Sequence, residues 1–107
     1  MTVAVARVLR IFLDDVAAPR YGYDLMRHTG FASGKLYPIL ARLERAGWLV
    51  REREDVEATV QGRPVRYFYR LNPSGLEEVR YQMAELSRQL QPSDGPAAAL
   101  RPEGGLT

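Results

Sequence analysis

Basic, hydroxyl and aromatic side chains share one face of a short amphipathic stretch, residues 33–48. Lys35, Tyr37 and Arg42 can each donate hydrogen bonds, and the two cations can also pair with anionic oxygens. Such donors on a helix that is apolar behind suit a ligand with repeating phosphates, as in nucleic acid. An ordinary amphipathic helix with a solvated charged face would show the same pattern, so the flanking segments must decide.

Residue types that carry enzyme chemistry are scarce. The chain has no cysteine, which excludes disulfides, thiolate metal sites and cysteine nucleophiles. His28 is the only histidine and has no neighbouring partner for proton transfer, so we expect it at the surface. Asp14 and Asp15 are adjacent and would point in different directions on a helix. With no phosphate-binding, dinucleotide or nucleophile motif, we expect no enzyme, no cofactor and no metal site.

The 107 residues are enough for one domain with a modest core, and the formal net charge is +2. The basic residues are concentrated in the middle third of the chain, where acidic residues interrupt them. No apolar run approaches the roughly 18 residues of a membrane span, and the N-terminus lacks a signal-peptide pattern. We therefore expect a cytoplasmic protein with no membrane partner.

Helical periodicity locates the elements that would position the basic face. Apolar residues recur at i, i+3, i+4 and i+7 in the central stretch: Leu36, Ile39, Leu40 and Leu43. Ser33 is expected to cap this helix and Gly47 to end it. Pro38 is tolerated only near a first turn, so we expect the regular helix to begin close to Leu36 or Tyr37.

The segments before it complete a known arrangement. Residues 2–17 have a wide apolar stripe and predict a first helix, which Pro19 ends. Residues 21–29 predict a short second helix, with Arg27 facing outward, and residues 30–33 a turn. A short helix, a glycine-containing turn and a helix with a basic face form a helix-turn-helix, whose second helix reads the DNA major groove.

Two extended runs follow, residues 48–55 and 65–71, each with alternating side chains. Between them lies a long tip, near which Arg63 and Arg66 are placed. This β-hairpin, after a helix-turn-helix, predicts the wing of a winged helix, whose basic tip would lie along the minor groove or the phosphates.

A final helix is predicted between the turn at 72–75 and Pro92. Its apolar residues recur at spacings of three and four: Leu76, Val79, Met83, Leu86 and Leu90. The seam is too short for a free coiled coil, so we expect it to pack on the first helix, of its own chain or of a partner. A homodimer is favoured over packing within one chain, with Val5, Leu9 and Phe12 of the first helix in the interface.

The fold class is therefore mostly α with a small β-hairpin: a winged helix-turn-helix plus a C-terminal dimerisation helix. We expect the DNA-binding domain in residues 1–73, the dimerisation helix in 74–91 and a disordered tail in 92–107. The residues expected to bind DNA are Arg27, Ser33, Lys35, Tyr37, Arg42, Arg63 and Arg66.

The sequence resembles the PadR family of transcriptional regulators. The likeness spans about residues 5–90 and rests on YGYDL at 21–25, GKLYPILARLE at 34–44 and RYFYRL at 66–71, in this order and spacing. It implies a winged-helix dimer that binds operator DNA, usually as a repressor, and that dimerises through the C-terminal helix. The short single final helix resembles the smaller branch of the family. Some members bind planar aromatic ligands through a Trp on that helix, but the only Trp here is Trp48.

The function expected from the sequence is a sequence-specific DNA-binding regulator, a homodimer on a pseudo-palindrome whose half-sites lie about one helical turn apart. An effector, small molecule or protein, could act at the first and last helices, but the sequence does not identify one. The alternative is a winged-helix protein-interaction module that modulates another regulator, with weak or non-specific DNA binding. Glu54, Asp55 and Glu57 in the wing favour that alternative.

Overall fold

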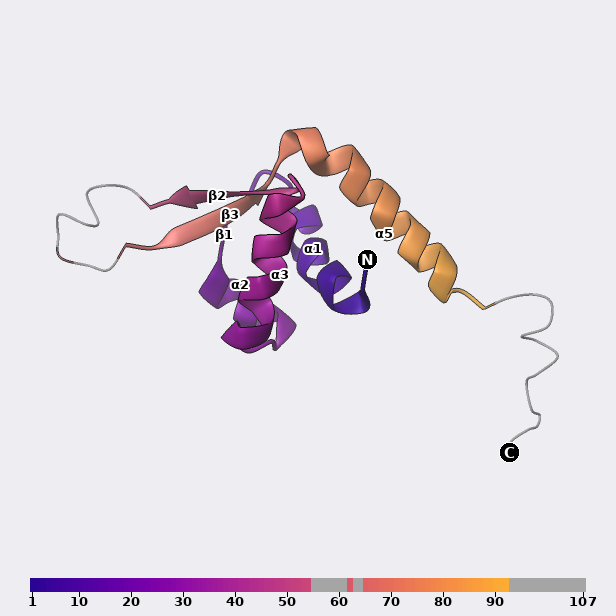
Figure 1. Cartoon of the computed structure of the whole chain (residues 1–107), viewed down its shortest axis with the longest axis horizontal. Coiled ribbons are helices and arrows are strands. Elements are labelled where there is room, and N and C mark those ends of the chain that lie inside the picture. The colour runs from indigo at the N-terminus through magenta and orange to yellow at the C-terminus, as the bar shows by residue number, and fades with distance from the viewer. Residues whose placement is uncertain (55–61, 63–64, 93–107) are drawn as a thin grey trace, which may run out of the picture.

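The computed structural model describes residues 1–54, 62 and 65–92. These form a winged helix with a C-terminal arm, the helix at residues 76–90 (Figure 1). The expected winged-helix architecture is confirmed. In chain order the elements are α1 (Val3–Asp14), β1 (Arg20–Tyr21), α2 (Gly22–Thr29), α3 (Ser33–Arg45), β2 (Leu49–Arg53), β3 (Tyr67–Leu71), a 3-10 turn η1 (Pro73–Gly75) and α5 (Leu76–Leu90). The predicted tail beyond residue 92 lies outside the described residues.

The sheet has three antiparallel strands in the order β1-β3-β2. Leu49 pairs with Leu71 and Arg53 with Tyr67, so β2 and β3 form the predicted hairpin. The sheet also has a strand that the sequence did not predict, because Arg20 and Tyr21 pair with Tyr69 and Phe68 of β3. The strand β1 thereby ties the start of α2 to the base of the wing.

The core lies where α1, α2, α3 and the sheet meet. Its fully buried side chains include Phe12, Leu25, Leu36, Leu40 and Leu49, one or more from each of these elements. Burying each such side chain stabilises the fold by roughly 1.5–3 kcal/mol, which is why the helical spacing predicted these elements correctly. The first helix is shorter than the predicted 2–17, since Asp15 already has an extended backbone.

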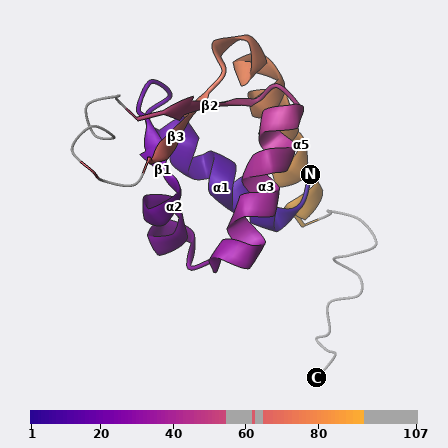
Figure 2. The same ribbon diagram turned by 60° about the vertical axis from the view of Figure 1, so that its left-hand side comes forward.

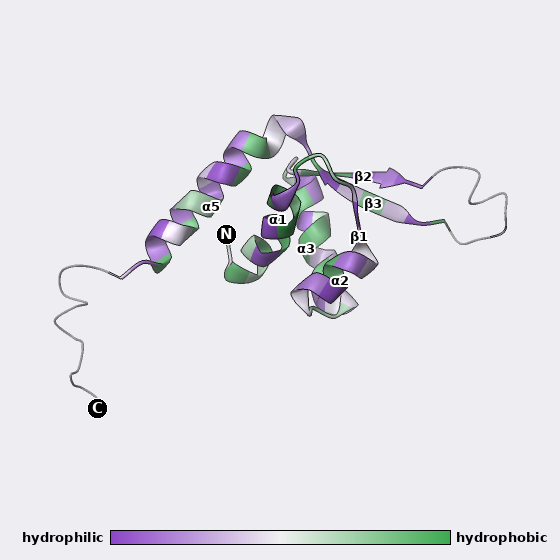
Figure 3. Ribbon diagram, turned by 180° about the vertical axis from the view of Figure 1, so that it is seen from behind, coloured by the Kyte–Doolittle hydropathy of each residue, from purple (hydrophilic) through white to green (hydrophobic). Residues whose placement is uncertain are grey.

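The helix α1 contacts both α2 and α5, and it lies between α3 and α5 in Figure 1. Figure 2 shows α1 crossing behind α3. The first half of α5 packs on the body, where Val79 is fully buried. The second half leaves it, and Leu90 is 65% exposed. Figure 3 shows hydrophobic and hydrophilic segments alternating along α5, which ends apart from the other helices. The wing and the end of α5 thus point in opposite directions (Figure 1).

A tight junction joins α3, β2 and the start of α5. The backbone N–H of Asn72 donates to the carbonyl of Trp48 at 2.9 Å, and the side-chain amide of Asn72 donates to the carbonyl of Gly47 at 3.0 Å. Gly47 has a φ of 83°, which favours glycine. A Cβ on Gly75 would lie 2.7 Å from the carbonyl oxygen of Gly47, so only glycine fits there without movement.

Candidate nucleic-acid interface

The helix α3 presents the basic face that its spacing predicted. Its apolar side, Leu36, Ile39, Leu40 and Leu43, is buried. Ser33, Lys35, Tyr37 and Arg42 are exposed on the other side. These four predicted DNA contacts therefore lie on a solvent-facing surface of the second helix of the helix-turn-helix.

Two expectations about the start of α3 are wrong. The helix begins at Ser33, and the N-cap is Ala32, whose side chain cannot accept a hydrogen bond. Helical structure also continues through Pro38, although we expected it to begin near Leu36 or Tyr37. The N–H that proline lacks would have bonded the carbonyl of Gly34, so the cost is confined to one bond near the helix start. The first turn of α3 is consequently part of the exposed face.

The turn between α2 and α3 is fixed by internal contacts. The hydroxyl of Thr29, a buried residue, donates to the carbonyl of Leu25 at 2.7 Å and accepts from the N–H of Phe31 at 3.0 Å. Two cations lie over the ring of Phe31, with Lys35 Nζ at 4.4 Å and the Arg7 guanidinium at 5.3 Å from its centroid. Phe31 therefore positions Lys35 beside the start of α3, and brings Arg7 of α1 to the same place.

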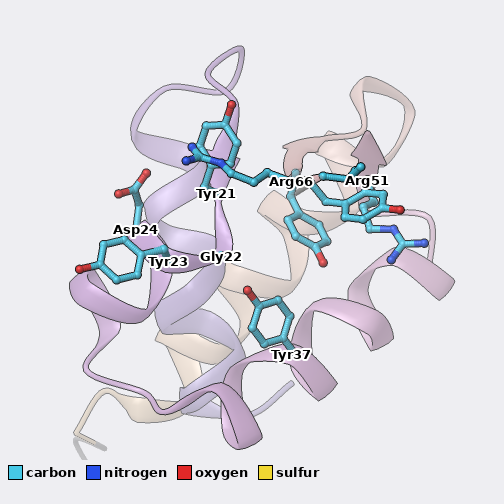
Figure 4. A pocket seen from close by; sticks show the side chains of 10 residues that line it. Tyr21, Gly22, Tyr23, Asp24, Tyr37, Arg51 and Arg66 are labelled. Atoms are coloured by element: carbon cyan, nitrogen blue, oxygen red, sulfur yellow. The ribbon is translucent and has the colours of Figure 1, made fainter. Parts of the chain in front are cut away.

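A notch of about 450 Å³ lies between α2, α3 and the wing (Figure 4). Its lining combines five tyrosines with two arginines, an aspartate and two small or apolar residues: Tyr21, Gly22, Tyr23, Asp24, Tyr37, Arg51, Val65, Arg66, Tyr67 and Tyr69. Tyrosine hydroxyls and guanidinium groups are the donors that DNA-binding proteins use on phosphate oxygens. The notch is thus suited to a phosphate of a backbone that passes between α3 and the wing.

Tyr37 stands at the base of the notch, with its hydroxyl directed to α2 (Figure 4). The phenol lies against the backbone of Gly22, so closely that a Cβ at Gly22 would be 2.1 Å from the hydroxyl oxygen. Its side chain nevertheless remains 43% exposed. The absence of a side chain on Gly22 therefore sets the position of this hydroxyl.

The two arginines reach the notch from different strands. Arg51 of β2 lies over the ring of Tyr67 at 4.8 Å and 4.0 Å from a carboxylate oxygen of Glu44. Arg66, just before β3, lies over the ring of Tyr21 at 4.5 Å. Burial raises the pKa of Tyr69 above its ordinary value, against the opposing effect of Arg51, so this phenol is neutral at physiological pH.

The remaining predicted DNA contacts are placed as follows. Arg27 is exposed on α2, 3.8 Å from a carboxylate oxygen of Asp24 and 5.8 Å from the centroid of Tyr23. Arg42 is exposed on α3 but does not line the notch. The prediction for Arg63 falls outside the described residues. The notch therefore gathers Tyr37 and Arg66 from the predicted set, while Lys35 and Arg42 lie along α3.

Sequence reasoning identified Tyr37 but missed Arg51 and the other four tyrosines of the notch as candidates. Arg51 alternates with Glu52 along β2, but which of them faces α3 depends on the register with β3. The signal that could have found it is the pairing of Arg51 with Tyr69, because Tyr69 is an apolar-face position of the clearer strand.

The predicted dimer residues differ in how far their own chain covers them. Val5, Leu9, Phe12 and Val79 are covered by their own chain, so their side chains are not available to a partner in this arrangement. Leu76 and Met83 are partly buried against the core. Leu86 and Leu90, together with Met83, line an open groove of about 680 Å³ between α1 and α5. A dimer contact through α5 stays a prediction, and it now depends on the residues of this groove.

Other kinds of site have little support in the described part of the chain. No group of three or more histidine, aspartate or glutamate side chains there is arranged to hold a metal ion. His28 is exposed, and its Nδ1 lies 2.8 Å from the carbonyl of Asp24 in its own helix. No described helix is both long and apolar enough to cross a membrane.

Comparison with known proteins agrees with this geometry. Residues 11–81 match the transcriptional regulator PadR-like family. The chain belongs to this family. Its structure is similar to that of smu.1704 from Streptococcus mutans UA159, with a TM-score of 0.66 and 30% sequence identity over 87% of this chain and 84% of that one. No curated protein sequence gives a significant match. The predicted resemblance is confirmed, and membership assigns the chain to the transcriptional regulators.

Proposed function

We propose that this PadR-like regulator binds operator DNA directly, as a homodimer on a pseudo-palindromic site, and represses transcription. The observation that carries the proposal is the notch between α3 and the wing, which Tyr37, Arg51 and Arg66 line. Lys35 is exposed on α3, the helix that carries Tyr37. Repression is the usual action that the family resemblance implies.

In the proposed complex the first half of α3 enters the major groove. Ser33, Lys35 and Tyr37 are exposed there and would lie nearest the base edges. One DNA strand then passes the notch, where the Tyr37 hydroxyl and the Arg51 guanidinium donate to a phosphate. Phosphate contacts of this kind fix the register of the protein, while contacts to base edges select the sequence.

The groove between α1 and α5 supports the homodimer. Its lining includes Leu13, Met83, Leu86 and Leu90, and α5 extends past the body at this point (Figure 3). An α5 helix from a second chain would cover these side chains, and a two-fold axis along the arm would repeat the contact. Two α3 helices related by that axis would read half-sites about one helical turn apart.

The direct test is fluorescence anisotropy with DNA from the protein's own upstream region and a scrambled control, at about 0.15 M salt and above. We expect the scrambled DNA to bind at least roughly a thousandfold more weakly. Equal and weak binding to both, lost at higher salt, would reject operator recognition and favour the protein-interaction alternative. Sedimentation of the same samples reports whether the bound species is a dimer.

Lys35 gives a residue-level prediction. Lys35→Gln removes one phosphate-neutralising charge, so affinity falls for all DNA sequences and the slope of log K against log salt decreases by about 0.9. Arg80→Gln is the matched control, because Arg80 is exposed on α5, away from α3 and the wing. A salt slope for Lys35→Gln equal to that of the control would remove Lys35 from the interface.

A further inference from the structure

A partly buried carboxylate lies at the base of the wing, next to one of the cations of the notch. Glu54 follows β2, and its side chain is only 19% exposed. One of its oxygens, Oε2, accepts a hydrogen bond from the Tyr21 hydroxyl at 3.2 Å and lies 3.8 Å from Nε of Arg66. The other, Oε1, is buried with no hydrogen-bond partner among the described residues.

The same three residues are joined by further contacts. The N–H of Glu54 donates to the carbonyl of Arg66 at 2.8 Å, and the Arg66 guanidinium lies 4.5 Å from the centroid of the Tyr21 ring. Tyr21 and Arg66 line the notch, but Glu54 does not. Figure 4 shows Arg66 extending across to Tyr21, on the opposite side of the notch from Tyr37. Arg66 is therefore directed to a carboxylate beside the notch.

Arg66 is 57% exposed, so it can turn without unfolding the wing. A DNA phosphate in the notch and the Glu54 carboxylate are both anions that seek the same guanidinium. The Glu54 carboxylate and a DNA phosphate would therefore compete for Arg66.

We propose that Glu54 is an internal competitor for DNA, an autoinhibitory carboxylate that withholds Arg66 from the phosphate in the notch. This inference rests on the proposed function and adds to it how the affinity is limited. A regulator with weakened backbone contacts depends more on contacts to base edges, so Glu54 raises the ratio of specific to non-specific binding. The acidic residue of the wing, which on sequence grounds favoured a protein-interaction module, thereby has a role within DNA binding.

Glu54→Gln tests the proposal, because glutamine keeps an oxygen that can accept from Tyr21 and Arg66 while it removes the charge. We expect the affinity for the upstream DNA to rise about fivefold at about 0.15 M salt and the salt slope to increase by about 0.9. The affinity for scrambled DNA should rise by a larger factor, so that the ratio of specific to non-specific binding falls.

Glu52→Gln is the matched control. Glu52 lies two residues away on β2 and pairs with Arg70 of β3 at 2.6 Å, but neither residue lines the notch. The two variants change the net charge equally, so a general charge effect would appear in both. The double variant Glu54→Gln/Arg66→Gln should bind like Arg66→Gln alone, because without Arg66 the carboxylate has nothing to withhold. Thermal unfolding of each variant checks that the wing remains folded.

Several outcomes would overturn the inference. Weaker binding by folded Glu54→Gln would make Glu54 a residue that positions Arg66 for DNA. A gain equal to that of Glu52→Gln, or one that persists without Arg66, would reduce it to overall charge. If wild type binds the upstream DNA specifically and Glu54→Gln binds identically, the competitor is refuted while the proposed function stands. If neither binds, both are refuted.

Discussion

Replacement of Gly22 by alanine should separate the stability of the fold from its affinity for DNA. The new Cβ would lie 2.1 Å from the Tyr37 hydroxyl oxygen, 2.7 Å from Cζ and 3.0 Å from Cε1. Unbonded carbon and oxygen atoms require well over 3 Å, so the phenol must move by more than about 1 Å. Since Tyr37 is 43% exposed, it can rotate into solvent and leave the backbone in place.

The two effects have different magnitudes. Gly22 is the first residue of α2, and alanine there stabilises the protein by about 0.4–1 kcal/mol because it reduces the conformational entropy of the unfolded chain. This gain offsets the lost packing of the phenol, so stability should change by less than about 1 kcal/mol. In the proposed complex the lost contact is a hydrogen bond from the Tyr37 hydroxyl to a charged phosphate. Such a bond contributes about 1.5 kcal/mol, which corresponds to roughly tenfold weaker DNA binding. Tyr37→Phe, which removes only the hydroxyl, should weaken binding by a similar factor.

A double-mutant cycle measures the coupling. In a Tyr37→Ala background, Gly22→Ala should have no further effect on anisotropy-measured affinity, and it should increase the free energy of unfolding because no phenol opposes it. If Gly22→Ala alone binds like wild type, the position of the phenol is irrelevant to DNA. If it destabilises the protein by more than about 3 kcal/mol, the phenol cannot move as argued.

Two other substitutions test the junction and the arm. Gly75→Ala places a Cβ 2.7 Å from the rigid carbonyl oxygen of Gly47, so we expect about 2 kcal/mol of destabilisation in thermal unfolding. The control is Gly34→Ala, which should be neutral or stabilising because nothing lies within 4 Å of the new Cβ. An equal effect of both substitutions would contradict the clash. Leu86→Glu introduces a charge in the α1–α5 groove, so sedimentation should show monomers in place of a dimer. Gln89→Glu is the control and should not change the oligomeric state, because Gln89 does not line the groove. A Leu86→Glu variant that sediments like the control would refute the arm as the dimer contact.

The sequence predicted those elements in which the apolar residues of the local pattern are also the residues that pack in the core. The apolar residues of α3 recur with helical spacing and form its buried face, and those of β3 alternate and form its buried face, so both elements were located correctly. The strand β1 was missed because two residues cannot show a period of two. Ser33 was misassigned as a cap because the bend before a helix depends on how the preceding turn packs, which Thr29 and Phe31 decide.

The candidate nucleic-acid interface was predicted only in part, because periodicity reports local patterns and not contacts between distant segments. Periodicity identifies that Leu9 and Phe12 are buried, but it does not tell whether their own chain or a partner covers them. Likewise, the direction of Arg51 depends on the strand pairing that brings it opposite Tyr69, and the notch depends on the closeness of Tyr37 to Gly22. Each of these is a relation between distant segments, which no local pattern contains.

The junction at Gly47 and Gly75 also connects the proposed DNA contact of α3 with the proposed dimer contact of α5. Asn72 holds the carbonyls of Gly47 and Trp48 through two hydrogen bonds, so the start of α5 is attached directly to the end of α3. In the proposed dimer the direction of α5 sets where the second α3 lies, and DNA accepts only a separation near one helical turn. An effector that binds α1 and α5 in the dimer and prefers one direction of the arm would therefore change operator affinity without touching the notch, by as much as its own affinities for the two directions differ. Because this linkage is reciprocal, operator DNA should change the affinity of such an effector by the same factor.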